Sequence, residues 1–98
     1  MSAFLICDVQ VKNREKLQEY LKLSEHTLEP FGGKFHAQAG RTETLEGEWS
    51  PKVIIIAEFP SIEKAKEWYG SSEYSKALKV KSEALDRNMI ITEGLDQS

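Results

Sequence analysis

The sequence predicts a single α+β domain in which strands and helices follow the order βαββαβ. Three observations predict this fold class. The chain has 98 residues, which suits one domain, residues 1–98. Short apolar or alternating stretches, typical of strands, are separated by two longer regions with the spacing of amphipathic helices. Serine, proline and glycine residues stand where these stretches meet.

The first unit is a strand followed by a helix. The strand is predicted over Ala3 to Val11, a stretch rich in Val, Ile, Leu and Phe. Asn13 is a suitable N-cap for the helix, and Pro30 with Gly32-Gly33 ends or kinks it. The inner stripe of this helix contains Leu17, Tyr20, Leu21, Ser24, Leu28 and Phe31.

Two further strands are expected to pair as an antiparallel hairpin. The first runs from Lys34 to Ala39, and we expect residues 41–48 to extend it to a turn at Gly47. The second runs from Lys52 to Phe59 and is apolar on both faces, which suits a strand covered on both sides. Alternation in the earlier strand puts Phe35, Ala37 and Ala39 on one side and Lys34, His36 and Gln38 on the other.

A second helix is predicted directly after this hairpin. Ser61 is its N-cap, with Pro60 before it, and Gly70 ends it. Trp68 is expected at the edge of the inner face. The residues expected on the inner face are Ile62, Ala65 and Tyr69.

The last elements are a third helix and a short strand. Ser71 or Ser72 caps the helix, Asn88 breaks it, and Met89 to Glu93 forms the strand. Residues 95–98 read as a polar tail. The inner stripe of the helix contains Tyr74, Ala77, Leu78, Lys81 and Leu85.

This element order is the ferredoxin-like arrangement, a four-stranded antiparallel sheet with helices on one face. The opposite face then carries more apolar surface than water tolerates, so we expect a second copy to cover it, sheet against sheet, in a homodimer. The apolar residues of that face are Phe4, Ile6, Ile54 and Ile56.

Composition excludes several classes of function. The chain has 40% hydrophobic and 30% charged residues, and its net charge of −3 offers no basic surface to nucleic acid or membrane. The only cysteine, Cys7, fits a reducing compartment, and the apolar start is too short for a signal peptide, so we expect a cytoplasmic protein. His26 and His36 lack the spacing of metal ligands, and we expect no metal site.

Two charged residues, Glu58 and Lys81, occupy otherwise apolar segments. Glu58 ends the apolar strand, and its carboxylate is either a general acid or base, a ligand anchor, or one half of a pair with the other subunit or a backbone amide. A raised pKa is expected there unless Glu58 has a partner. Lys81 either extends its ammonium to water along an apolar stripe or pairs with Glu58 or Asp8.

Other polar and aromatic residues are candidates for ligand binding. Asp8, His36 and Gln38 share the Glu58 face if the strand register allows it; they form either a polar site or a hydrogen-bonded layer that fixes subunit docking. Tyr69 and Tyr74 are expected to face inward, beside Trp49 and Trp68, and aromatic residues at these places are either core or the walls of a site for a small ligand. By contrast, His26 is expected to be exposed and Cys7 to be buried and inert.

A set of short motifs, taken in order and spacing, resembles the bacterial family known as domain of unknown function 1330. The resemblance spans nearly the whole chain. The motifs are Asp8-Val9, Tyr20, Phe31-Gly32-Gly33, Leu45-Glu46-Gly47 with Trp49, Glu58-Phe59-Pro60-Ser61, Trp68-Tyr69 and Ser72-Glu73-Tyr74.

The resemblance implies a ferredoxin-like subunit and face-to-face dimers of the dimeric α+β barrel superfamily, which includes cofactor-free monooxygenases, isomerases and haem-binding enzymes. We therefore expect a small homodimeric enzyme that acts on a small organic molecule without a tightly held cofactor. The alternatives are a non-catalytic ligand-binding module and a structural dimer.

The chain departs from the family at Gln38-Ala39-Gly40 and at Lys81, where arginines are typical, and at Ser72, where proline is typical. If those arginines bind an anion, their bidentate geometry is lost here.

Overall fold

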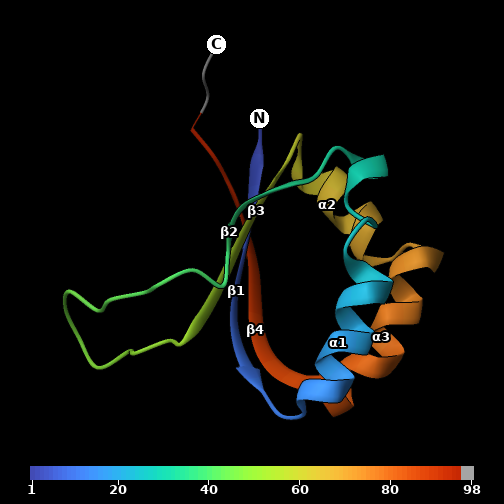
Figure 1. Cartoon of the computed structure of the whole chain (residues 1–98). Coiled ribbons are helices and arrows are strands. Elements are labelled where there is room, and N and C mark those ends of the chain that lie inside the picture. Colours follow the sequence, from blue (N-terminus) through green and yellow to red (C-terminus); the bar gives the residue numbers. More distant parts are fainter. Residues whose placement is uncertain (96–98) are drawn as a thin grey trace.

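In the computed structural model, which describes residues 1–95, the chain forms one four-stranded antiparallel sheet with its helices on a single face (Figure 1). The strand order β2-β3-β1-β4 is the ferredoxin-like arrangement expected from the sequence. Of the predicted tail at 95–98, only Leu95 lies within the described residues. The elements are β1 (Ala3–Val11), α1 (Arg14–Ser24), a 3-10 turn (Glu29–Phe31), β2 (Lys34–Gln38), β3 (Val53–Phe59), α2 (Ile62–Tyr69), α3 (Ser72–Ala84) and β4 (Leu85–Glu93).

The helix starts are fixed by side-chain caps. Asn13 accepts a hydrogen bond from the backbone N–H of Lys16 at 3.1 Å, and Ser61 caps α2 in the same way. Ser71, rather than Ser72, caps α3. These caps satisfy backbone N–H groups that have no partner within the helix. The first helix ends at Ser24, earlier than its apolar stripe, and Leu28 reaches the core from the turn that follows.

Two strand boundaries differ from the prediction. Residues 39–52 form a loop, not an extension of β2, because Ala39 adopts the left-handed region (φ 63°), where a strand cannot continue. Beyond the bond from Ala39 N–H to the carbonyl of Ile54, the chain leaves the sheet. The last strand begins at Leu85 instead of Met89 because β4 pairs with β1 along its full length. Asn88 therefore lies inside a strand, opposite Asp8.

A β-bulge at His36 changes the face that the end of β2 presents. Phe35 pairs with Ala57, but Ala37 pairs with Ile56, so one residue of β2 is extra. The extra residue reverses the alternation, and Gln38 then lies opposite Ile55 on the helix-facing side. The predicted alternation, which put Gln38 on the Glu58 face, is therefore wrong beyond the bulge.

The core lies between the sheet and the helices. Two glycines allow the turn before β2 to approach it closely: Gly32 has a φ of 77°, and a Cβ on Gly33 would stand 2.7 Å from the Phe59 ring. The buried apolar residues include Leu5, Cys7, Val9, Tyr20, Leu28, Ala57, Phe59, Ala65, Trp68, Tyr74, Ala77, Ala84 and Leu85.

No described helix covers the other face of the sheet, which we call the bare face (Figure 1). The Cα trace measures 43 × 39 × 16 Å. Its smallest extent, 16 Å, is the thickness of one sheet and one helix layer. The loop 39–52 extends beyond the sheet on the side away from the helices (Figure 1). Among the helices of residues 1–95, none has the length and apolarity that crossing a bilayer requires. The apolar residues of the bare face are Phe4, Ile6, Ile54, Ile56 and Ile90, the first four half-buried and Ile90 exposed.

Candidate functional site

An arginine and two tyrosines form a polar cluster between the sheet and the helices. Arg87 on β4 donates from Nη1 to the Tyr20 hydroxyl at 2.8 Å and from Nη2 to the Tyr74 hydroxyl at 2.7 Å. The two hydroxyls are 2.6 Å apart and share a hydrogen bond of their own. Since Tyr20 belongs to α1 and Tyr74 to α3, the cluster connects both long helices to the sheet.

The strand register explains why Arg87 points inward. Arg87 pairs with Val9 of β1, and the alternate residues Met89 and Ile91 pair with Cys7 and Leu5. All of these lie on the helix-facing side, so a cation occupies one position of an otherwise apolar row.

Burial sets the protonation states in the cluster. It raises the pKa of the Tyr74 phenol far above the usual range, and Tyr20 raises it further, so the hydroxyl stays neutral. Burial alone would lower the pKa of the Arg87 guanidinium, but the two tyrosines outweigh that effect and the pKa is raised. Burial also raises the pKa of the Cys7 thiol, with Arg87 opposing it. The cluster therefore presents one fixed positive charge among neutral groups.

A cavity of about 150 Å³ adjoins this cluster, and we call it the Arg87 cavity. Its walls are mostly apolar and come from the sheet and the helices. Tyr20, Tyr74 and Arg87 bring their polar groups together at its wall, and an apolar pocket with a few convergent polar groups is typical of a small-molecule site. Apart from the cluster, the lining residues important here are Leu5, Ile55, Trp68 and Met89, with Ser24 and Gln38 as polar neighbours.

Trp68 and Tyr69 of α2 occupy the reverse of the expected positions: Trp68 faces inward and Tyr69 outward. Trp68 is buried, stacks on Tyr74 with ring centres 4.1 Å apart, and donates its indole N–H to Thr27 Oγ1 at 2.9 Å. Tyr69 is 48% exposed, so the prediction that it faces inward is wrong. The indole finds a hydrogen-bond partner on the inner side, whereas no side-chain hydrogen bond of residues 1–95 involves the Tyr69 hydroxyl.

Glu58 and His36 form a pair on the bare face. His36 Nε2 donates to Glu58 Oε1 at 2.6 Å, because a carboxylate can only accept. This hydrogen bond holds the pKa of the Glu58 carboxyl below its usual range despite partial burial. The partner is thus a histidine of the same chain, a pairing that differs from both the subunit contact and the backbone amide considered above.

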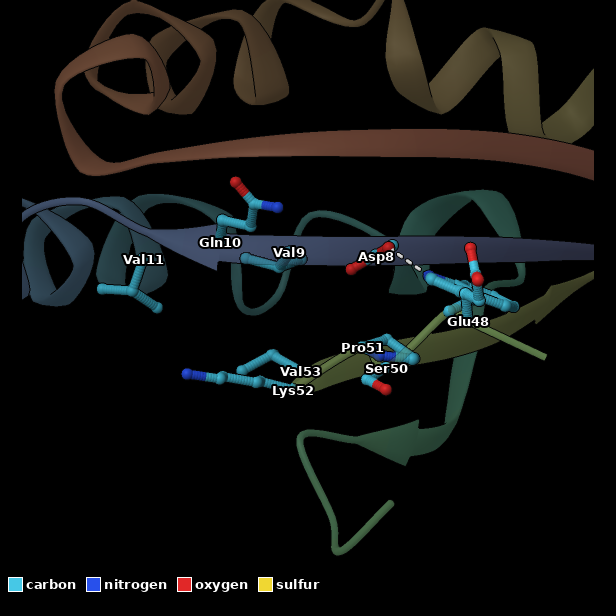
Figure 2. A pocket seen from close by; sticks show the side chains of 10 residues that line it. Asp8, Val9, Gln10, Val11, Glu48, Ser50, Pro51, Lys52 and Val53 are labelled. Carbon is cyan, nitrogen blue, oxygen red and sulfur yellow. Dashed lines mark hydrogen bonds between the residues drawn. The ribbon is translucent and has the colours of Figure 1, made fainter. Parts of the chain in front are cut away.

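Asp8 and Trp49 form a second pair on the same face. The indole N–H of Trp49 donates to Asp8 Oδ2 at 2.8 Å, and Figure 2 shows this bond at the Asp8 side chain. The pair stands beside an open groove of about 660 Å³ between the end of β1 and the returning loop, with Glu48 and Lys52 on its rim (Figure 2). Trp49 is 62% exposed and bonded to Asp8, so the prediction that it stands beside an inward-facing Tyr74 is wrong.

The predicted site residues are therefore divided between the two faces of the sheet. Asp8, His36, Trp49 and Glu58 lie on the bare face, and Tyr74 lies in the Arg87 cavity. Lys81 is half-buried on α3, and among residues 1–95 it forms no ion pair with Glu58 or Asp8. Of the two alternatives given for Lys81, the pairing is excluded, because those carboxylates lie across the sheet.

Sequence reasoning missed Arg87 and assigned Tyr20 only to the core. The alternation of Leu85, Arg87, Met89 and Ile91 would have indicated that Arg87 faces inward, but this pattern is visible only when the strand starts at Leu85.

Within the described residues 1–95, no group of three or more His, Cys, Asp or Glu side chains is placed to hold a metal ion.

A family model described as a domain of unknown function (DUF1330) matches residues 2–95. None of the curated proteins matches the chain significantly.

Solved structures with the same fold cover nearly the whole chain. A protein of unknown function from Rhodopseudomonas palustris is 22% identical, with a TM-score of 0.79 over 97% of this chain and 83% of that chain. A dimeric ferredoxin-like protein of unknown function from Bacteroides fragilis is 16% identical, with a TM-score of 0.61 over 95% and 96%. The cofactor-independent oxygenase SnoaB from Streptomyces nogalater is 5% identical, with a TM-score of 0.65 over 98% and 95%. At these identities the likeness is one of fold.

Proposed function

This chain belongs to the DUF1330 family, and we propose that it is a homodimeric protein that binds one small organic molecule per subunit in the Arg87 cavity. The observation that carries the proposal is the meeting of an apolar cavity with a convergent polar cluster. Pockets of this composition are the usual sites of small ligands, since apolar walls supply affinity and a few polar groups fix orientation.

The bare face supports the dimer. Four half-buried apolar side chains and the exposed Ile90 form a continuous patch across β1, β3 and β4, and two polar pairs flank it. A patch of this kind is rarely left in water. A second copy placed sheet against sheet covers it, and the fold-mate from Bacteroides fragilis is described as dimeric. In this arrangement the protruding loop, with Leu45 96% exposed, is free to contact the partner.

A thermal-shift screen of small organic molecules tests the ligand site. A compound present at a hundred times its dissociation constant stabilises the protein by about 2.7 kcal/mol, which is a rise of about 10–20 °C in Tm for a domain of this size. Ser24, 8% exposed, lines the cavity, so Ser24→Leu should fill it and abolish the shift. The proposal fails if no compound shifts the wild-type protein, or if every shift persists in Ser24→Leu.

A cofactor-independent enzyme is the second candidate function. The observation in its favour is that two phenolic hydroxyls and a guanidinium meet at the wall of the cavity, an arrangement that can stabilise an oxyanion formed during proton transfer. SnoaB is described as a cofactor-independent oxygenase and has the same fold. Turnover that is lost in Tyr74→Phe while binding is retained would distinguish an enzyme from a binder.

The catalytic role predicted for Glu58 remains a prediction, and we favour a docking role for the Glu58–His36 pair. Glu58 is on the bare face, across the sheet from the Arg87 cavity. The hydrogen-bonded pair lies at the margin of the patch that a second subunit would cover, where polar pairs fix the register of two docking surfaces.

A further inference from the structure

The positive charge of Arg87 is not neutralised by a nearby carboxylate. Among residues 1–95, no Asp or Glu oxygen lies within ion-pair distance of the guanidinium, although Arg87 is half-buried. The neighbouring Asp86 side chain is 70% exposed and pairs with Lys12 at 3.8 Å. Glu25 is the one carboxylate among the lining residues, and it is 55% exposed and pairs with His26 at 3.7 Å. Buried charges in proteins are normally paired, so the unpaired guanidinium favours an anionic group on a ligand of this cavity.

The hydrogen-bond inventory of the cluster has the same imbalance. Arg87 has five N–H donors, of which two are bonded to the tyrosine oxygens. The single bond between the hydroxyls uses one phenolic hydrogen, and the other phenolic hydrogen has no acceptor among the side-chain bonds of residues 1–95. Hydrogen-bond donors in the cluster therefore outnumber acceptors. A ligand with two acceptor oxygens could accept hydrogen bonds from the unused donors.

Volume and wall chemistry limit the rest of the ligand. A cavity of about 150 Å³ with apolar walls accepts a molecule the size of benzene, and drug-sized ligands need at least about 300 Å³. Leu5, Ile55, Trp68 and Met89 provide walls that favour a hydrocarbon or aromatic group over a hydrated inorganic ion.

We propose that the ligand is a small monocarboxylic acid, with its carboxylate on Arg87 and the phenolic hydroxyls and its short aromatic or branched hydrocarbon group against Trp68 and Met89. This inference rests on the proposed function, because it names the ligand class of the same cavity. Carboxylate and guanidinium are matched in charge and in planar geometry.

Calorimetric titration of the untagged protein tests the ligand class with three probes: benzoate, the neutral benzamide of the same shape, and inorganic phosphate. Loss of one hydrogen bond to a charged group costs about tenfold to a hundredfold in affinity, so benzoate should bind more tightly than benzamide by that factor. Phosphate should show no saturable binding. Occupancy is followed independently through Cys7, the only cysteine of the chain, which lines the cavity. Its buried thiol reacts with iodoacetamide only when the structure opens, so the reaction should slow when a ligand fills the cavity and stabilises the closed form.

Matched variants assign the effect to Arg87. In Arg87→Gln the preference for benzoate over benzamide should vanish, whereas Arg41→Gln, the same change at a residue 86% exposed in the loop, should retain it. The comparison of benzoate with benzamide on the wild-type protein needs no variant, so the proposal remains open to refutation if Arg87→Gln does not fold.

The outcomes separate the two proposals. Equal binding of benzoate and benzamide, with Cys7 protected by both, overturns the carboxylate assignment and leaves the proposed function intact. Tighter binding of phosphate than of benzoate overturns the assignment as well. If neither aromatic compound binds or protects Cys7, both the carboxylate assignment and the cavity as a ligand site are rejected.

Discussion

Arg87 contacts both long helices from the last strand, and its two partners are neutral hydroxyls. A buried guanidinium in such surroundings costs desolvation free energy that two hydrogen bonds only partly offset. The arrangement suits the proposed anionic ligand, because the charge and the unused donors are held in place before a ligand arrives. The same bonds also connect three elements, so we expect the cluster to contribute to stability as well.

Tyr20→Phe should lower the free energy of unfolding by about 1–3 kcal/mol, because it removes the acceptor for Arg87 and the bond to Tyr74. Urea denaturation measures the change. Tyr69→Phe is the matched control: that side chain is 48% exposed, and its loss of a hydroxyl should change stability by less than about 0.5 kcal/mol. Equal effects of the two substitutions would contradict the role given to the cluster.

The Glu58–His36 pair predicts a dependence of stability on pH. The pKa of Glu58 is lower in the folded chain than its ordinary value of 4.5, so the folded state favours the ionised carboxylate. Its contribution is present above that ordinary value and is lost as the pH falls through the lower, folded-state pKa.

Urea denaturation between about pH 7 and about pH 3 should therefore show a shallower acid loss of stability in Glu58→Gln than in the wild type. Glu46→Gln, in the exposed loop, serves as the control and should retain the wild-type slope. A Glu58→Gln protein with an unchanged acid slope would show that the pair does not stabilise the folded chain.

At the scale of elements, close contacts between turns and the sheet position the site. The turn before β2 approaches Phe59 at Gly33, and the bulge that follows turns Gln38 toward the Arg87 cavity. Both features occur within one short edge strand. A change in this turn should therefore affect the fold and the cavity together.

Gly33→Ala should be destabilising by about 1–3 kcal/mol, since its Cβ would stand 2.7 Å from the Phe59 ring and 2.9 Å from the Leu28 Cβ in the core. Gly40→Ala is the control, because nothing lies within 4 Å of a Cβ there. The two midpoints in urea give the comparison. Tolerance of Ala at Gly33 without loss of stability would mean that the packing of this turn is looser than described.

Most of the fold follows from local signals in the sequence. Caps at Asn13 and Ser61 and the apolar runs of β1 and β3 determine their elements directly, since each depends on neighbouring residues. The site was harder to predict because it depends on register. One bulge residue moved Gln38 to the other face, and four residues wrongly assigned to a helix concealed Arg87.

The sequence lacks the family's arginines near Gln38 and at Lys81, which suggested that the site has no guanidinium. A guanidinium reaches the cavity from β4, an element whose start could not be located from the sequence alone. The partners of Glu58 and Asp8 come from β2 and from the long loop, and no local pattern specifies either contact.

At the scale of the whole molecule, the subunit is a two-layer slab with ligand chemistry on one side of the sheet and an apolar face on the other. The Arg87 cavity is assembled from a single chain, whereas the bare face is apolar and has no cover within residues 1–95. The proposed dimer would therefore stabilise the sheet that holds Arg87 without occupying the proposed ligand site.

Ile90→Asp should weaken the proposed dimer strongly, because Ile90 is 59% exposed on the bare face, beside Ile6, and an unpaired charge at a docked interface costs several kcal/mol. Leu23→Asp, at an exposed apolar residue of the helix layer, should leave the dimer unchanged. The concentration dependence of the sedimentation coefficient measures both. Equal dimerisation of the two variants would move the interface away from the bare face.

Sedimentation velocity of the wild-type protein at about micromolar concentration tests the central claim, that a second copy covers the bare face. The account predicts one species with twice the subunit mass of 11.1 kDa. A single species of 11.1 kDa, with Ile90 and its apolar neighbours open to water, would contradict it.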